Sequence, residues 1–188
     1  LLVSDLLEAE VGPRVSREEF PAAAELFAPE PWEGTDALAA VREALTDAAR
    51  LLRGEAPFLR EPHGTPGLVA WAELLRAGAR IDRPGHAFHL ARLHAARLAA
   101  AEFCADLAAA FAPAQEALHR AAAAFREEAK ALSQLLTLFP YPSGGGSAAS
   151  HPGLRRIAAA VLERAAELER EAAGALDVVL EAIPPSAD

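Results

Sequence analysis

The sequence predicts an all-α protein, a bundle of about six helices, three of them long and mostly antiparallel. Alanine supplies much of the 52% hydrophobic fraction and aromatic residues only 6%, a mix that suits close helix–helix packing. β-Branched residues are scarce, which disfavours strands. Apolar residues recur at intervals of three and four, and no convincing alternating pattern appears after residue 10. With 188 residues, the chain is long enough for one domain with a substantial core.

The chain is expected to divide into residues 1–34, an N-terminal segment and linker, and residues 35–188, the helical bundle. Ser16 and Glu19 form a capping box, which predicts a short helix toward Phe27. The opening LLVSDLL has the pattern of a strand already under way, and the sequence contains no methionine. Both features indicate a fragment whose first segment is the end of an upstream domain.

Two helices are expected in the next part of the chain. Thr35 is a suitable N-cap for a helix that stops at Gly54, because serine, threonine and aspartate cap helix starts and glycine ends helices. Thr65 followed by Pro66 at the first helical position predicts a second helix that ends at Gly78.

The three long helices follow. Asp82 can cap a helix that runs to about Phe111, and Pro113 opens the next helix, whose apolar residues alternate by four and three up to Phe139. A flexible loop is expected over residues 140–150, since it contains two prolines and three consecutive glycines. Ser150 is the predicted cap of the last helix, which two prolines terminate after residue 183.

The charge balance argues against a nucleic-acid partner. The formal net charge is −9, whereas a protein that follows a phosphate backbone needs a basic face. Arginine outnumbers lysine 17 to 1, but the arginines are scattered along the sequence and form no basic run. No membrane partner is expected either, because the sequence has no apolar run of about 18 residues and no signal peptide. A cytoplasmic location is the resulting expectation.

The segment between residues 83 and 104 contains His86, His89, His94 and the only cysteine, Cys104. A zinc site needs three or four ligands at one point, and on a helix these side chains do not converge. His86 and His89 could supply two ligands with the rest from another helix; the alternative, which we favour, is ordinary partly buried or capping histidines. Cys104 falls on the apolar stripe and is expected to be a structural residue with an unactivated thiol.

Other motifs for catalysis or cofactors are weak. Glu116 and His119 match one ExxH motif, but a di-iron bundle needs two such motifs and further inward glutamates, and Glu116 is expected to face solvent. The glycines of residues 143–147 lack the strand and lysine of a phosphate-binding loop. The sequence therefore predicts no catalytic residue, no metal and no cofactor.

Arg97 is the one unexpected residue on the apolar stripe of its helix. A buried guanidinium needs a carboxylate and hydrogen-bond partners, and Glu169 lies inside the apolar sector of the last helix. We hypothesise a buried ion pair between Arg97 and Glu169 that fixes the register of two long helices. The alternative is that the alanine-rich faces leave room for Arg97 to reach solvent.

Four segments together resemble one family: VSDLLEAEVGPRVSREEFPAAAELF, GTPGLVAWAELL, AAAAFREEAKALSQL and LRRIAAAVLERAAELEREAAGAL. They resemble the C-terminal helical region of the butirosin-biosynthesis-protein-H-like family. The resemblance implies an upstream domain similar to papain-like cysteine peptidases, which moves an acyl group from a carrier protein to an amine in secondary metabolism. The catalytic cysteine and histidine belong to that upstream domain, so the resemblance assigns no catalytic residue to this chain.

Two functions follow as expectations. The first is the helical C-terminal part of a cysteine-dependent acyltransferase-like protein, with the upstream catalytic domain as its partner. The alternative is a stand-alone helical binding or oligomerisation module. An exposed apolar face on a long helix would point to a homodimer.

Overall fold

The computed structural model describes residues 37–56 and 61–183, and this part of the chain is all-α, as predicted. It contains five α-helices and two short 3₁₀ segments, and no strand occurs in these residues. The α-helices are α3 (Ala37–Arg53), α4 (Gly64–Arg76), α5 (Arg83–Ala110), α6 (Gln115–Leu138) and α7 (Pro152–Ala182). They correspond to five of the expected helices, while the one expected after Ser16 lies outside the described residues. No helix among those described has both the length and the apolar character needed to cross a membrane.

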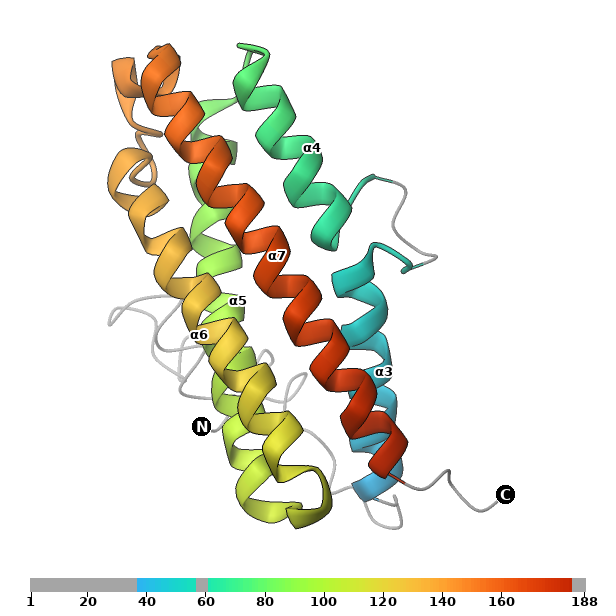
Figure 1. The fold of residues 1–188 in the computed structure, drawn as a ribbon. Coiled ribbons are helices and arrows are strands. Elements are labelled where there is room, and N and C mark those ends of the chain that lie inside the picture. The colour runs from blue at the N-terminus through green and yellow to red at the C-terminus, as the bar shows by residue number, and fades with distance from the viewer. Residues whose placement is uncertain (1–36, 57–60, 184–188) are drawn as a thin grey trace, which may run out of the picture. The chain divides into compact units, whose positions relative to one another are not determined.

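The three long helices pack in chain order, and the two shorter ones share one position beside them (Figure 1). The 3₁₀ segment η1 (Ala112–Ala114) turns the chain at the end of α5, so that α6 runs back along it. α7 packs against α6 and also contacts both α3 and α4. In Figure 1, α3 and α4 follow one another along α7, so together they occupy the place of a single fourth helix with a break halfway.

The core of the bundle consists of two apolar clusters, one on either side of its middle. The first joins α3 to the later half of α5, the early half of α6 and the later half of α7. The second joins α4 to the opposite halves of the same three helices. Fully buried leucines anchor both clusters: Leu45, Leu118 and Leu176 in the first, and Leu75, Leu90, Leu132, Leu135 and Leu162 in the second. What separates the clusters is a layer of charged residues, described below.

Several predicted helix ends are confirmed. The Asp82 carboxylate accepts a hydrogen bond from the Gly85 backbone N–H at 3.1 Å and caps α5. Gly54 directly follows α3, and Gly78 follows Ala77, the C-cap of α4. Their φ values are 76° and 71°, a conformation that glycine adopts without strain.

The predicted cap at Thr65 is wrong. α4 begins at Gly64, and its N-cap residue is His63, which makes no side-chain capping bond. Gly64 has a φ of 57°, and an added Cβ there would meet the backbone of Leu51 and Leu52. Only glycine fits this close approach to α3. Gly64 therefore allows α4 to start one residue before Thr65. The Thr65 hydroxyl is then free to point into the bundle.

The predicted cap at Ser150 is also wrong. His151 is the N-cap of α7, and its Nδ1 accepts from the Leu154 N–H at 3.4 Å. Ser150 belongs to the 3₁₀ segment η2 (Gly146–Ser150), and its Oγ accepts a hydrogen bond from Arg83 Nη2 at 3.1 Å. The hydroxyl therefore connects the start of α5 to the segment before α7.

Candidate functional site: a buried charged layer and an arginine-lined pocket

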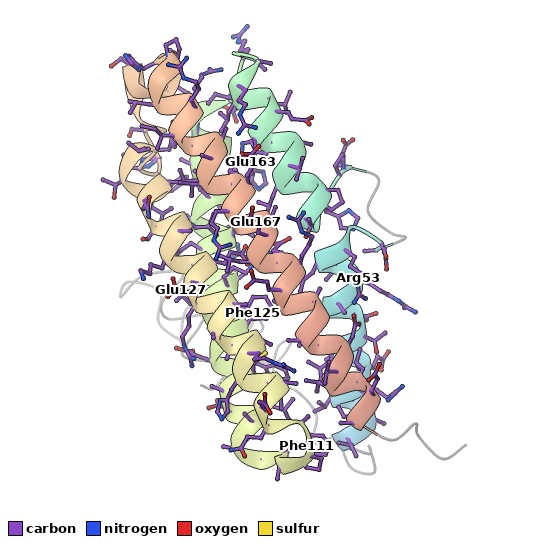
Figure 2. The ribbon with its side chains drawn as sticks, in the orientation of Figure 1. Arg53, Phe111, Phe125, Glu127, Glu163 and Glu167 are labelled. Atoms are coloured by element: carbon purple, nitrogen blue, oxygen red, sulfur yellow. The ribbon has the colours of Figure 1, made fainter. Side chains whose placement is uncertain are left out.

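Three charged side chains meet between the two apolar clusters, one from each long helix. Arg97 Nε of α5 donates to both carboxylate oxygens of Glu128 on α6, at 2.8 and 2.9 Å. Arg97 Nη2 donates to Oε1 of Glu169 on α7. The two glutamate side chains are 0% and 1% exposed, and that of Arg97 is 14% exposed. We call these residues the charged triad. It lies about halfway along the bundle, near Phe125, which Figure 2 labels on α6 and whose ring centroid is 5.9 Å from the guanidinium carbon.

The triad has one cation for two carboxyl groups, and this sets its protonation. Burial raises the pKa of Glu128 to about 8, although the charge of Arg97 acts against the increase. Burial also raises the pKa of Glu169, with Arg97 again opposing it. For Arg97, burial acts to lower the pKa, but the two glutamates outweigh it and the pKa is raised. At neutral pH the arrangement therefore favours a charged Arg97 and one proton on the pair of buried carboxyl groups, so that one of the two is a carboxylate.

Two members of the triad, Arg97 and Glu169, were predicted from the sequence, and the third was not. The structure brings Arg97 and Glu169 into hydrogen-bond contact, so the alternative in which Arg97 reaches out to solvent does not describe its position. Glu128 was overlooked, although it stands between Phe125 and Ala129 on the apolar side of α6. Thr65 Oγ1 adds a fourth contact, 3.4 Å from Glu169 Oε2, and links α4 to the same layer.

The three histidines of α5 differ in how far they are exposed to solvent. His86 is buried, His89 is exposed and His94 is partly exposed. Trp71 Nε1–H donates to His86 Nδ1 at 3.0 Å, so the ring is neutral with its proton on Nε2, which finds no partner among the described residues. Burial lowers the pKa of His86 to about 4, and the charges of Arg155 and His89 act in the same direction.

Cys104 is buried among apolar residues, as the sequence predicted, and is 2% exposed. Burial raises the pKa of its thiol to about 11, with the charge of Arg126 acting slightly the other way. Since the thiolate is the reactive form, this environment suits a structural residue. Glu116 and His119 are both exposed on α6. Within residues 37–56 and 61–183, no three His, Cys, Asp or Glu side chains are grouped so that they could hold a metal ion.

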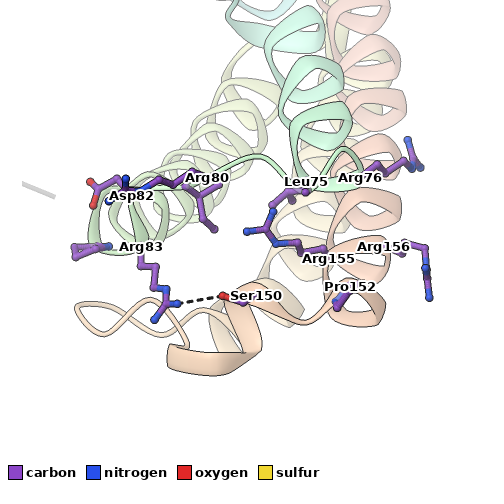
Figure 3. A pocket seen from close by; sticks show the side chains of 12 residues that line it. Leu75, Arg76, Arg80, Asp82, Arg83, Ser150, Pro152, Arg155 and Arg156 are labelled. Carbon is purple, nitrogen blue, oxygen red and sulfur yellow. Dashed lines mark hydrogen bonds between the residues drawn. The ribbon is translucent and has the colours of Figure 1, made fainter.

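A pocket of about 1040 Å³ opens at the end of the bundle where α4 ends and α5 and α7 begin (Figure 3). Its polar lining is dominated by five arginines, Arg76, Arg80, Arg83, Arg155 and Arg156. Asp82 is the one carboxylate among the lining residues. In a chain whose net charge is −9, the lining of this pocket has an excess of positively charged side chains.

Arg155 is the most constrained of these arginines. It is 8% exposed, and it donates through Nε to the carbonyl of Ala149 and through Nη1 to that of Ala79, each at 2.7 Å. No carboxylate in the described part of the chain pairs with it. Two backbone carbonyls thus hold the guanidinium in place at the pocket wall without neutralising its charge.

The clustering of arginines in the fold was not expected from a sequence in which they form no basic run. They are scattered in the sequence, but folding brings residues 76–83 and residues 155–156 to the same end of the bundle. A sequence signal existed, because each of the five pocket arginines lies within about two helical turns of a predicted helix end. Whether these arginines come together depends on which helix ends are neighbours in the fold. The spacing of apolar residues in the sequence does not predict this.

Comparison of the chain with known protein families, with curated proteins and with solved structures finds no match. The similarity to the butirosin-biosynthesis-protein-H-like family therefore stays a prediction from the sequence segments alone. The triad and the pocket are the features of the described residues that bear on function.

Proposed function

We propose that the helical bundle is a binding module that holds an anionic group of its ligand in the arginine-lined pocket. The observation that carries the proposal is Arg155, a buried guanidinium at the pocket wall whose charge no carboxylate of the described residues balances. Burying an uncompensated charge is costly, and an anion in the pocket would supply the missing counter-charge. This proposal gives a concrete form to the alternative of a helical binding module.

The triad has a different role in this proposal. Its three members satisfy one another in the middle of the bundle and are nearly inaccessible, so they are suited to fixing the register of the long helices. A shift of one helix by a turn would place a charged group of the triad in an apolar cluster. The pocket, in contrast, is open to solvent, and its arginines have more positive charge than its one carboxylate can balance.

The acyltransferase-like function remains a proposal that rests on the resemblance. It places the catalytic residues outside this chain, and the buried thiol of Cys104 agrees with that placement. Nothing in the described residues favours it over a binding module. The two functions are compatible, because a helical part with an anion site could accompany a catalytic domain.

The test is to titrate the protein with sodium sulfate, with sodium chloride at equal ionic strength as the reference. A ligand that binds only the native state at 100 times its Kd stabilises it by about 2.7 kcal/mol, which raises the Tm by roughly 5–10 °C for a domain of this size. Side-chain NMR signals of the arginines locate the site.

The variants Arg80→Gln and Arg83→Gln should each reduce the sulfate-specific increase in Tm. Arg120→Gln is the matched control, since Arg120 is an exposed arginine on α6 that does not line the pocket. If sulfate and chloride give equal shifts, or if Arg120→Gln reduces the effect as much as Arg80→Gln, the pocket is not an anion site.

A further inference from the structure

The outward side of α5 is apolar, unlike that of α6. Phe88, Leu98 and Phe103 are between 43% and 46% exposed there. Between Phe88 and Ala110, eight of the twelve exposed residues are apolar, whereas the exposed residues of α6 are all polar except Ala123. α5 is also the least amphipathic of the five helices. A helix that is apolar on all sides is typical of a buried position, so the outward side of α5 is suited to contact with another protein surface.

The exposed apolar surface follows one direction along α5 and continues beyond the helix. The residues within about 40° of this direction, on a helix of 3.6 residues per turn, are Phe88, Arg92, Ala95, Ala99, Glu102 and Asp106. All six are exposed, and together with Leu98 and Phe103 at the two sides we call them the α5 face. The ring centroid of Phe88 lies 6.0 Å from that of Tyr141, which is 60% exposed, so the apolar surface extends past the end of α6.

The charges of α5 are divided between its two halves. Arg92 lies before the middle of the α5 face, and Glu102 and Asp106 lie after it. Between residues 83 and 97 the helix contains no acidic residue, and between residues 98 and 110 it contains no basic residue. This order is unfavourable for α5 alone, because a helix is stabilised by acidic residues near its start and basic residues near its end. A neighbouring helix of the same sequence that runs the other way would place an acidic half beside each basic half.

A second copy of α5 in antiparallel orientation therefore matches the charges of the α5 face. When the two-fold axis passes at the level of Arg97, each residue faces the one that is equally far on the other side of Arg97. Ala95 then faces Ala99 of the partner subunit, and Arg92 faces Glu102 of the partner subunit. The symmetry repeats both contacts within the dimer. Alanine at the centre allows the two helix axes to approach to about 8 Å.

The shape and size of the α5 face also fit a second copy. Phe103 faces Ala91 of the partner subunit in this arrangement, so a large side chain meets a small one. A helix of 28 residues is about 42 Å long and about 10–12 Å wide, so two such faces together cover roughly 900 Å². This area is near the lower limit for specific interfaces, and we therefore expect a dimer that dissociates in the micromolar range.

We infer from these observations that the α5 face is a homodimer interface, in which two copies of α5 pack antiparallel with the two-fold axis at the level of Arg97. The inference is independent of the proposed function, because no residue of the α5 face lines the arginine-lined pocket. Dimerisation and anion binding can therefore be tested separately.

Sedimentation equilibrium from low micromolar to submillimolar concentrations tests the interface. The average mass should rise from that of the monomer to twice that value. Phe103→Ser should raise the dissociation constant at least about tenfold, because it truncates an aromatic side chain twice in each dimer. Leu74→Ser is the control and should leave the constant unchanged, since Leu74 is a 54% exposed apolar residue on α4, outside the α5 face.

A charge exchange tests the antiparallel orientation. Glu102→Arg places like charges opposite one another and should weaken the dimer at least about tenfold at low salt, while Glu43→Arg, at an exposed position on α3, should not. The double variant Arg92→Glu with Glu102→Arg restores opposite charges and should recover the dimer. The two positions are about 15 Å apart along α5, so this recovery has to come from contacts between copies.

Three outcomes would overturn the inference. A chain that stays monomeric at submillimolar concentration leaves the α5 face for a different partner. A dimer that Phe103→Ser does not weaken forms through another surface. If the double variant fails to recover what Glu102→Arg loses, the copies are not antiparallel and the pairing about Arg97 is wrong. Circular dichroism of each variant checks that its helix content is retained, so that a lost dimer is not a lost fold.

Discussion

Replacing Glu128 by glutamine isolates the proton held in the charged triad. Glutamine has nearly the same shape as a protonated glutamate, and its amide oxygen can still accept from Arg97. If Glu128 is the protonated member at neutral pH, Glu128→Gln keeps one cation and one carboxylate in the layer. The substitution removes a proton-binding site, so the variant should match the wild type near pH 4.5 and become the more stable of the two as the pH rises.

The size of the effect follows from the two pKa values. The pKa of Glu128 is raised from 4.5 to about 8 in the folded protein, so between these values the folded state binds one proton more than the unfolded state. A raised folded-state pKa gives stability that is fully present below the unfolded pKa and is lost as the pH rises through the folded pKa. Relative to that of Glu128→Gln, the free energy of unfolding of the wild type should fall by about 1.4 kcal/mol per pH unit across this window, or by up to about 5 kcal/mol in all.

Urea unfolding followed by circular dichroism at pH 5, 6, 7 and 8 measures this difference. The free energy of unfolding of the wild type minus that of Glu128→Gln should decrease steadily with pH. Glu127→Gln is the control, because Glu127 is the exposed neighbour and its replacement leaves the triad intact. Equal pH slopes for the wild type and Glu128→Gln would refute the assignment of the proton, and a loss of several kcal/mol in Glu128→Gln at pH 7 would show that both carboxyls are ionised.

Three further predictions concern other parts of the bundle. Arg97→Met removes the only cation of the triad and should destabilise the protein by about 3–5 kcal/mol at neutral pH in urea unfolding, because it leaves buried carboxyl groups without a partner; a loss below 1 kcal/mol would contradict this. The Cys104 thiol should resist a thiol reagent at pH 8 in the native protein and react fully in urea, since it is buried with a pKa of about 11; rapid native modification would contradict its burial. Gly174→Ala should raise the stability by about 0.5–1 kcal/mol, because Gly174 lies inside α7 and an added Cβ meets no atom within 4 Å; thermal unfolding checks the sign.

The sequence was sufficient for the features that depend on local order. The all-α class and the long helices follow from alanine content and from spacings of three and four. The cap at Asp82 and the stops at Gly54 and Gly78 need only a few neighbouring residues to be recognised. Arg97 was identifiable because a charged residue in an apolar stripe is a local contradiction that requires a partner.

Features that depend on the packing of particular neighbours were harder to predict. Glu128 gave the same kind of signal as Arg97, since it lies beside Phe125 in the apolar stripe of α6, and it could have been found. The packing at the start of α7 could not be predicted, because Leu154, Ile157 and Val161 are spaced by three and four, and this spacing places Ile157 on the apolar stripe. Ile157 is 53% exposed and Arg155 is buried instead. The carbonyls that accept from Arg155 come from η2 and from the segment after α4, which no helical periodicity describes.

The positively charged helix ends at the pocket have a consequence for how this protein could change under selection. An arginine in the first turn of a helix is unfavourable by about 0.3–1 kcal/mol compared with a neutral residue. Without a bound anion, the protein is therefore less stable with Arg83 and Arg155 than it would be with neutral residues at the same helix positions. Exchanging the exposed Arg83 for an acidic residue would improve the fold and repel the proposed ligand. Selection for stability alone would therefore be expected to remove such residues, whereas selection for ligand binding would retain them. This end of the bundle is thus where a trade-off between folding and binding should be found.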